Sequence, residues 1–311
     1  MRDEVVSCVE YWSERCEFPV GRFLHWLGLS RGKFRDWVRR VGQENAHNAR
    51  APRRFWLLPG EIQAITEFAA SHHDTGYRRL SYMMLDADIA AVSPATVYRV
   101  LDKAGLMPRH PSEPSRKGQG FDQPLLPHEH WHIDISYVNL QATFYYLFSV
   151  LDGASRYIVH WELRTSAVTS EVETMLQRAR EKFPDARPRI ISDNGPQFVA
   201  REFKEFIRVC GMSHVRTSPY YPQSNGKIER YHRSLKTECL RPGTPLDVED
   251  ARRLLSAYVE QYNTVRLHAG IGYITPQACL LGLQDEILAE RRMKLHAARE
   301  RRQQAVSTPN R

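Results

Sequence analysis

The sequence predicts an α/β protein: a mixed five-stranded sheet with flanking helices, preceded by all-α units. Helical periodicity in the first 107 residues is followed by a proline-rich stretch, then by three strand patterns in a row, then by alternating helix and strand patterns. With 311 residues, the chain is long enough for about two domains of roughly 150 residues each.

Residues 18–44 are expected to form two short helices around a tight turn. Gly28 interrupts the first helical pattern, and Ser30 is suited to cap the second helix. The apolar residues recur at helical spacing: Phe23, Leu24 and Leu27, then Phe34, Trp37, Val38 and Val41.

A cationic face accompanies this apolar face. Arg31, Lys33, Arg35 and Arg39 point away from the apolar positions, as in a helix-turn-helix whose second helix enters a major groove. The alternative is an ordinary basic surface helix. Residues 20–54 hold nine Lys or Arg against two acids, which favours the DNA-binding interpretation.

A second helical unit is predicted over 55–107, with three helices. Ser93 caps the third helix, Pro94 occupies its first position and Gly105 ends it. Its inward positions are Val97, Val100 and Leu101, and its outward positions, the candidate DNA contacts, are Thr96, Arg99 and Lys103. A purely structural helical bundle is the alternative.

Residues 108–127 are expected to be a linker, because five prolines and two glycines in this stretch cannot continue a helix. A separate domain should therefore begin near residue 128.

Strand patterns begin directly after the linker. In HEHWHIDISYVNL, Trp131, Ile133, Ile135 and Tyr137 alternate with His132, Asp134 and Ser136. Two further strands, ATFYYLFSVLD and SRYIVHWELR, are joined by a hairpin-type connection at 152–155, and ARPRIIS and SHVRTS are the fourth and fifth strands.

Three acids are placed to act together. Asp134 lies mid-strand on the polar side, Asp193 lies just past the fourth strand in SDNGPQFV, and Glu229 lies one turn into a helix. A carboxylate in a central strand is costly without compensation, and neighbouring carboxylates repel. Mg²⁺ removes both costs, and a two-metal site suits in-line displacement at phosphorus. Asp193 is therefore interpreted as a metal ligand.

The sequence motifs around these acids resemble those of a known family. HIDISYV, YYLFSVLDGASRYIV, SDNGPQFVAREF, TSPYYPQSNGKIERYHRSLKTE and YNTVRLHAGIGYITPQA occur in the order found in the catalytic core of retroviral integrases and, more closely, of bacterial insertion-sequence transposases. The resemblance covers about residues 128–280. It implies a ribonuclease-H-like fold over 128–282 and an Asp-Asp-Glu triad at Asp134, Asp193 and Glu229.

The same resemblance implies two Mg²⁺ or Mn²⁺ ions held by the triad. Structural zinc is not expected, since His72 and His73 are adjacent and no cysteine pair follows them, unlike the zinc domain of retroviral integrases. The helical N-terminal units resemble the DNA-binding part of such transposases.

Further DNA contacts are predicted around the third acid. Arg233 and Lys236 share a helix face with Glu229, opposite a core stripe of Ile228, Tyr231 and Leu235. A surface ion pair between Glu229 and Arg233 is the alternative. The set is completed by Gln223, Asn225 and Lys227 at the preceding loop, where simple turn-forming roles are the alternative.

Other positions have open interpretations. His132 either lines the site or is a hydrogen-bonded core histidine, and Tyr262, Asn263, Arg266 and His268 are expected to stabilise the end of the core. The basic helical tail, 283–311, either binds DNA or a second subunit, or is a solvated charged helix.

Charge and cysteine usage indicate the setting. A net charge of +8 and a pI of about 9.3 favour a polyanionic partner. Five scattered cysteines without CxxC and the lack of a signal peptide or membrane span predict a cytoplasmic, nucleoid-associated protein without a membrane partner.

The resemblance implies a transposase that binds the terminal inverted repeats of a mobile element and target DNA as a homo-oligomer. The alternatives are a DNA-binding regulator that does not cut, and a nuclease for RNA–DNA hybrids, which helix-turn-helix units suited to B-form grooves argue against.

Overall fold

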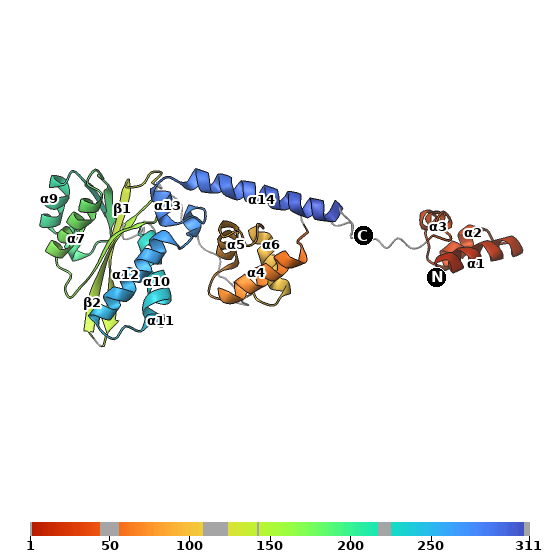
Figure 1. Cartoon of the computed structure of the whole chain (residues 1–311), viewed down its shortest axis with the longest axis horizontal. Helices are drawn as coiled ribbons and strands as arrows, with labels where there is room; N and C mark the ends of the chain where they lie inside the picture. Colours follow the sequence, from red (N-terminus) through yellow and green to blue (C-terminus); the bar gives the residue numbers. More distant parts are fainter. Residues whose placement is uncertain (1, 44–55, 108–123, 142, 217–224, 308–311) are drawn as a thin grey trace. The chain divides into compact units, whose positions relative to one another are not determined.

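The computed structural model describes residues 2–43, 56–107, 124–141, 143–216 and 225–307. The chain divides into two compact units, Met1–Arg53 and Arg54–Arg311. Figure 1 shows the first unit as helices alone and the second as a sheet with helices on both faces, a helical bundle and a long C-terminal helix.

The first unit consists of α1 (Arg2–Arg15), α2 (Val20–Trp26) and α3 (Arg31–Val38). Ser30 caps α3 as predicted, since its Oγ accepts a hydrogen bond from the Lys33 N–H at 3.3 Å. Helix α1 was not predicted, and the unit starts at Arg2 instead of residue 18. It shares a small core with the other two helices: Val6, Val9, Leu24 and Phe34.

The predicted apolar face of this unit is wrong at three positions. Leu27, Val38 and Val41 are exposed, because α1 covers only the part of α2 and α3 that presents Leu24 and Phe34. With so few buried residues, helical spacing alone overstates the width of the core-facing stripe.

The second helical bundle contains α4 (Pro59–Ser71), α5 (Tyr77–Asp86) and α6 (Pro94–Lys103), as predicted. Ser93 caps α6 by accepting from the Thr96 N–H, and Pro94 occupies its first turn. The three helices enclose a core of their own, which includes Ile65, Leu80, Met84, Val97 and Leu101. Most of the predicted linker, residues 108–123, lies outside the described residues.

The sheet has the strand order β3-β2-β1-β4-β5. Strands β1 to β3 are antiparallel neighbours, whereas β4 runs parallel to β1 and β5 runs parallel to β4. This is the mixed topology of the ribonuclease-H-like fold, and it agrees with the predicted fold class. The bounds are β1 (His130–Leu140), β2 (Thr143–Asp152), β3 (Ile158–Arg164), β4 (Arg189–Ser192) and β5 (Ser213–Arg216).

Helices cover both faces of this sheet (Figure 1). One face packs against α7 (Thr169–Lys182), α8 (Pro196–Val199) and α9 (Arg201–Val209), and receives the odd-numbered β1 residues Trp131 and Ile133. The other face packs against α10 (Gly226–Leu235), the π-helical η2 (Lys236–Leu240) and α12 (Val248–Thr264). Because both faces are covered, the polar side of β1 is buried as well, including His132 and Ser136.

Short elements complete this layer and lead to the last helix. They are α11 (Arg241–Gly243), η3 (Ala269–Ile271) and α13 (Pro276–Leu280), and they precede α14 (Gln284–Ser307). Among the described residues, no helix is both long and apolar enough to cross a membrane.

One side of the helix in the basic tail is buried, so the tail is not a fully solvated helix. Arg291, Ala298 and Arg302 of α14 are buried at i, i+7 and i+11, on one stripe of the helix. Arg291 donates to Asp86 at 2.6–2.7 Å, and Arg302 donates to Glu61 at 2.7–3.0 Å. This stripe therefore joins α14 to the α4–α6 bundle.

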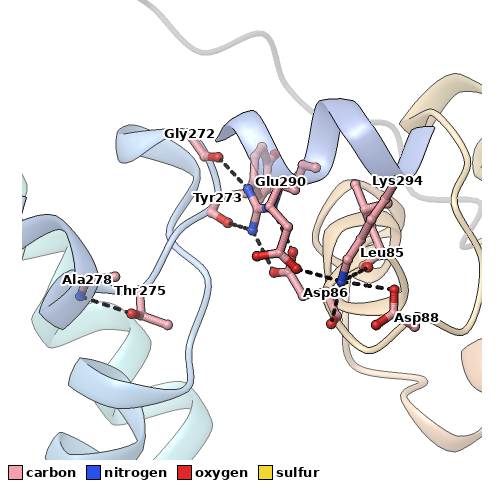
Figure 2. A network of polar contacts seen from close by, with 10 residues as sticks. Leu85, Asp86, Asp88, Gly272, Tyr273, Thr275, Ala278, Glu290 and Lys294 are labelled. Carbon is pink, nitrogen blue, oxygen red and sulfur yellow. Dashed lines mark hydrogen bonds and ion pairs between the residues drawn. The ribbon is translucent and has the colours of Figure 1, made fainter. Parts of the chain in front are cut away.

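The same junction reaches the end of the catalytic domain. Arg291 also donates to the carbonyls of Gly272 and Tyr273, at 3.4 and 2.7 Å. Figure 2 shows Asp86 between this segment and Lys294, whose ammonium group pairs with Asp88 and Glu290. One buried guanidinium thus connects the bundle, the core segment and the last helix.

Candidate active site

The first two acids lie side by side on neighbouring strands. Parallel pairing of β1 with β4 places His132 opposite Ile191, and two residues further along, just past the last residue of β4, Asp193 comes level with Asp134. Asp193 accepts the Gly195 N–H on Oδ1 at 3.0 Å, which shapes the turn after β4. The side chain of Asp134 is 18% exposed, and that of Asp193 is open to solvent.

The third acid joins them from the helix layer. Glu229 is in the first turn of α10 and is exposed. Partial burial raises its pKa, and the negative charges of Asp134 and, more weakly, Asp193 raise it further, while Arg233 and His232 oppose this. Glu229 therefore lies close enough to both aspartates to experience their charges.

The chemistry of these residues fits a divalent cation. Carboxylate oxygens are the ligands that Mg²⁺ and Mn²⁺ prefer, and a cation between them would remove the repulsion that raises the pKa of Glu229. Within the described residues, no group of three or more His, Cys, Asp and Glu side chains lies close enough together to hold a metal ion. The side chains of Asp134, Asp193 and Glu229 are therefore neighbours that do not converge on one point in this structure.

A histidine that the sequence interpretation overlooked contacts the first acid. His232 is 5% exposed; its Nδ1 lies 3.3 Å from Oδ2 of Asp134 and its Nε2 lies 3.0 Å from Oγ of Ser149. The core stripe Ile228, Tyr231 and Leu235 has the spacing i, i+3, i+7, and His232 fills its i+4 position. A histidine at that position of a core stripe is the signal that would have identified it.

Asn225 is a correction to the predicted DNA contacts. Its side chain is 2% exposed and faces β1, with Nδ2 3.5 Å from the Ile133 carbonyl. Because it is enclosed between the start of α10 and the sheet, it is not a surface residue that DNA could reach in this conformation.

Lys227 is also directed inward. Its Nζ donates to the Gly153 carbonyl at 2.9 Å, in the turn between β2 and β3, instead of extending into solvent. Burial and the nearby Arg156 lower the pKa of Lys227 to about 7, against the attraction of Asp152. We therefore correct its assignment from DNA contact to anchor of the helix start.

His132 is a core residue in this structure. It is fully buried, and burial, with the nearby Lys227, lowers its pKa to about 3. Its ring nitrogens have no hydrogen-bond partner of ordinary geometry, although the Asn225 side chain lies close enough to affect its pKa. Of the two interpretations, the core position holds, but without the expected hydrogen bond.

The remaining candidate DNA contacts lie at the surface or outside the described residues. Gln223 belongs to the segment 217–224, which lies outside them. Thr96 is half-buried and lies 3.0 Å from the Ser93 hydroxyl, and Lys236 is half-buried at the start of η2. The exposed members are Arg31, Lys33, Arg35, Arg39, Arg99, Lys103 and Arg233.

The residues at the end of α12 and directly after it have the structural role that was predicted. Asn263 accepts the Ile158 N–H at 2.8 Å and donates to the Ile158 carbonyl at 3.1 Å. Arg266 pairs with Glu238, and His268 accepts the Gly270 N–H at the start of η3. The Asn263 contacts join α12 to the edge strand β3, and the Arg266 pair joins the following segment to η2.

Two family models of the integrase core domain match the chain, over residues 124–222 and 210–276. The chain is 25% identical over 251 residues to a putative transposase of insertion sequence IS986/IS6110 from Mycobacterium tuberculosis, covering 74% of this chain and 90% of that protein. It is 26% identical over 225 residues to the transposase InsD of IS2 from Escherichia coli, covering 66% and 73%.

An insertion element IS476 protein of Xanthomonas euvesicatoria is 27% identical over 219 residues, which are 68% of this chain and 62% of that protein. Among solved structures, a simian T-cell lymphotropic virus intasome chain has a TM-score of 0.46 at 21% identity, over 70% of this chain and 74% of that one. The HTLV-2 integrase catalytic core domain, solved with magnesium, has a TM-score of 0.41 at 19% identity, over 50% and 98%.

The fold and the two family models identify an integrase core domain over residues 124–276, a catalytic domain of the polynucleotidyl-transferase class. Over this domain and beyond it, the chain is similar to transposases of insertion sequences.

Proposed function

We propose that this transposase binds the terminal inverted repeats of a mobile element and carries out strand cleavage and strand transfer with Asp134, Asp193 and Glu229. The observation that carries the proposal is that three acids, from β1, from just past β4 and from α10, come close enough for Asp134 and Asp193 to raise the pKa of Glu229. Structural acids are usually separated or paired with cations, whereas perturbed carboxylates that repel one another are typical of functional sites.

The reaction proceeds in two displacements at phosphorus. Water attacks a phosphodiester at the element end, and the bond to the 3′ oxygen breaks, so that a free 3′-hydroxyl and a 5′-phosphate result. That hydroxyl then attacks a phosphodiester of target DNA and displaces the 3′ oxygen of the target strand. No covalent link to the protein is needed, so no serine or tyrosine nucleophile is assigned.

The triad would hold two Mg²⁺ or Mn²⁺ ions, and no structural zinc is assigned to the chain. When bound, such ions supply activation of the attacking oxygen and stabilisation of the leaving oxygen. The chain's own contribution is to hold Asp134 on β1, Asp193 directly after the neighbouring strand β4, and Glu229 on a helix packed against the sheet.

The exposed basic residues of α3 and α6 are the proposed DNA-recognition surfaces. Arg31, Lys33 and Arg35 are on the solvent side of α3, and Arg99 and Lys103 are on the solvent side of α6. Arg233 would contact phosphates beside the triad. Both element ends must be processed together, so we propose a homo-oligomer assembled on DNA in the nucleoid.

The experiment combines purified protein, labelled inverted-repeat duplexes and Mg²⁺ or Mn²⁺. We expect metal-dependent 3′-end cutting and joining by the wild type. Asp193→Asn should bind the duplex normally and lose at least about 1,000-fold in strand transfer, because one carboxylate ligand is gone. The double variant Lys33→Ala/Arg35→Ala should instead weaken duplex binding. Its affinity should also depend less on salt concentration, by the amount expected for the loss of about two phosphate contacts.

The outcomes separate the proposal from its rivals. Full strand transfer by Glu229→Gln would refute the triad. Binding without cutting by the wild type, under either metal, would support a DNA-binding regulator. Cleavage of RNA–DNA hybrids in preference to the element ends would support a hybrid nuclease.

A further inference from the structure

Three polar side chains form a buried, connected network behind the triad. Asp134 and Ser149 are direct partners on the antiparallel strands β1 and β2. His232 of α10 lies between their side chains, with Nδ1 3.3 Å from Oδ2 of Asp134 and Nε2 3.0 Å from Oγ of Ser149. Ser149 is fully buried and His232 is 5% exposed.

This network gives both ring nitrogens of His232 a polar partner. With the proton on Nδ1, the imidazole donates to Asp134 and accepts the hydroxyl hydrogen of Ser149. The other oxygen of Asp134, Oδ1, accepts the Ile135 N–H at 2.9 Å. Both carboxylate oxygens of Asp134 are therefore held, so the side chain has a defined rotamer in front of α10.

The place of His232 on its helix gives this contact a further consequence. His232 follows Glu229 by three residues, within one turn of α10. The neighbouring residues Ile228, Tyr231 and Leu235 are buried against the sheet, so α10 is seated firmly there. A contact from this turn to Asp134 links the helix that carries the third acid to the strand that carries the first.

We propose that His232 is a positioning residue that, anchored by Ser149, fixes the rotamer of Asp134 and its separation from Glu229 for divalent-metal binding. The inference rests on the proposed function, since it assigns metal binding to the triad. A carboxylate ligand held by an outer hydrogen bond loses less freedom when the metal binds, and removing such a partner typically costs about 10–100-fold in metal affinity or activity.

The competing explanation is that His232 only fastens α10 to the sheet. The two explanations differ in what a change should affect. A fastening role predicts lower stability with an unchanged metal requirement, whereas a positioning role predicts a changed metal requirement in protein that is still folded.

The test uses the full chain with three variants. His232→Phe keeps a ring of similar shape without nitrogens, His232→Gln keeps a donor, and Ser149→Ala removes the anchoring hydroxyl. Ser81→Ala is the matched control, because Ser81 is also a buried serine bonded once, to the Val92 carbonyl, but lies in α5. Thermal stabilisation of each protein is measured against MnCl₂ and MgCl₂ concentration, beside strand transfer.

We expect His232→Phe to need about 10–100-fold more Mg²⁺ for half-maximal thermal stabilisation and for strand transfer, with normal duplex binding. His232→Gln should recover part of this loss, Ser149→Ala should show a smaller shift in the same direction, and Ser81→Ala should match the wild type. An unchanged Mg²⁺ requirement in a folded His232→Phe or Ser149→Ala protein would overturn the proposal.

A second measurement remains informative if His232→Phe does not fold. The ¹⁵N shifts of histidine-labelled protein report which ring nitrogen carries the proton. We expect one ring in the wild type to be protonated at Nδ1 and to shift on Asp134→Asn and on Ser149→Ala. If no ring shows this behaviour, the proposal is overturned. If the wild type is inactive but shows this signature, and Ser149→Ala shows the metal shift, the result counts against strand transfer alone.

Discussion

At the scale of single residues, two partly buried histidines have strongly shifted pKa values. Burial, together with neighbouring cations, lowers the pKa of His268 to about 3 and that of His214 to about 4. For His268 these cations are Arg156, Arg266, Arg79 and, more weakly, Arg230. Such a ring is neutral in the folded protein and would have to be protonated among positive charges at acidic pH.

His268 should therefore make the protein sensitive to acid. Its pKa is about 3 when folded and about 6.5 when unfolded, so the unfolded state binds the extra proton. Stability is complete above pH 6.5 and falls as the pH drops towards 3, by at most about 1.4 kcal/mol per pH unit from this residue.

His268→Asn tests this, because asparagine keeps an acceptor for the Gly270 N–H but does not titrate. The free energy of unfolding, measured by urea titration between pH 7 and pH 4, should fall less steeply in this variant. The exposed His73→Asn serves as control and should follow the wild-type curve. Equal slopes for His268→Asn and wild type would contradict the assignment.

At the scale of elements, the side-chain amide of Asn263 fastens α12 to an edge strand. Strand β3 lies at the edge of the sheet, so one side of its backbone lacks a strand partner. The pairing of β2 with β3 also shifts between Val150 and Leu151, next to Ile158. Asn263 satisfies both backbone groups of Ile158 at this irregularity.

Asn263→Ala should lower the free energy of unfolding by about 2–4 kcal/mol, because it leaves a buried N–H and a buried C=O without partners. Guanidinium unfolding should show a lower midpoint at an unchanged slope. The exposed strand residue Asn139 provides the matched change, and Asn139→Ala should shift the midpoint by no more than about 0.5 kcal/mol. A similar small shift for both would show that the amide contacts are dispensable.

At the scale of the second unit, the basic tail serves as a structural connection. Arg291 is 4% exposed and contacts Asp86 of α5 together with the Gly272 and Tyr273 carbonyls (Figure 2). Tyr82 of α5 stacks on Tyr273 at 4.8 Å, and Arg79 donates to the Leu267 carbonyl. The bundle that carries α6 is thereby held to the domain that carries the triad.

Removing one partner of this junction should cost more than removing both. Asp86→Ala leaves the buried Arg291 charge uncompensated and should destabilise by about 2 kcal/mol, the low end for such pairs because Asp86 is partly exposed. Arg291→Leu together with Asp86→Ala should recover part of that loss. Arg292→Leu, a change at the exposed neighbour, is the control.

The measurement is urea unfolding of the four proteins, with limited proteolysis of the α4–α6 bundle as a second readout. A double variant that is no more stable than Asp86→Ala would contradict this prediction.

Local pattern was sufficient for much of this molecule. The five strands, the caps Ser30 and Ser93, and the positions of Asp134, Asp193 and Glu229 follow from period, turn residues and strand ends, which are properties of short segments. The sequence motifs around the acids added the resemblance to integrase cores, and the family comparisons agree with that resemblance.

Only the tertiary structure decided which polar groups are inside. Asn225 and Lys227 follow a polar loop and have the composition of surface contacts, yet the packing of α10 on β1 and the β2–β3 turn directs them inward. His232 and Arg291 belong to the core, although one carries a titratable ring and the other a full charge. Each is paired there with an acid, Asp134 and Asp86, that lies 98 and 205 residues away along the chain. Periodicity describes neighbours within a segment, whereas burial and pairing depend on segments that meet only after folding.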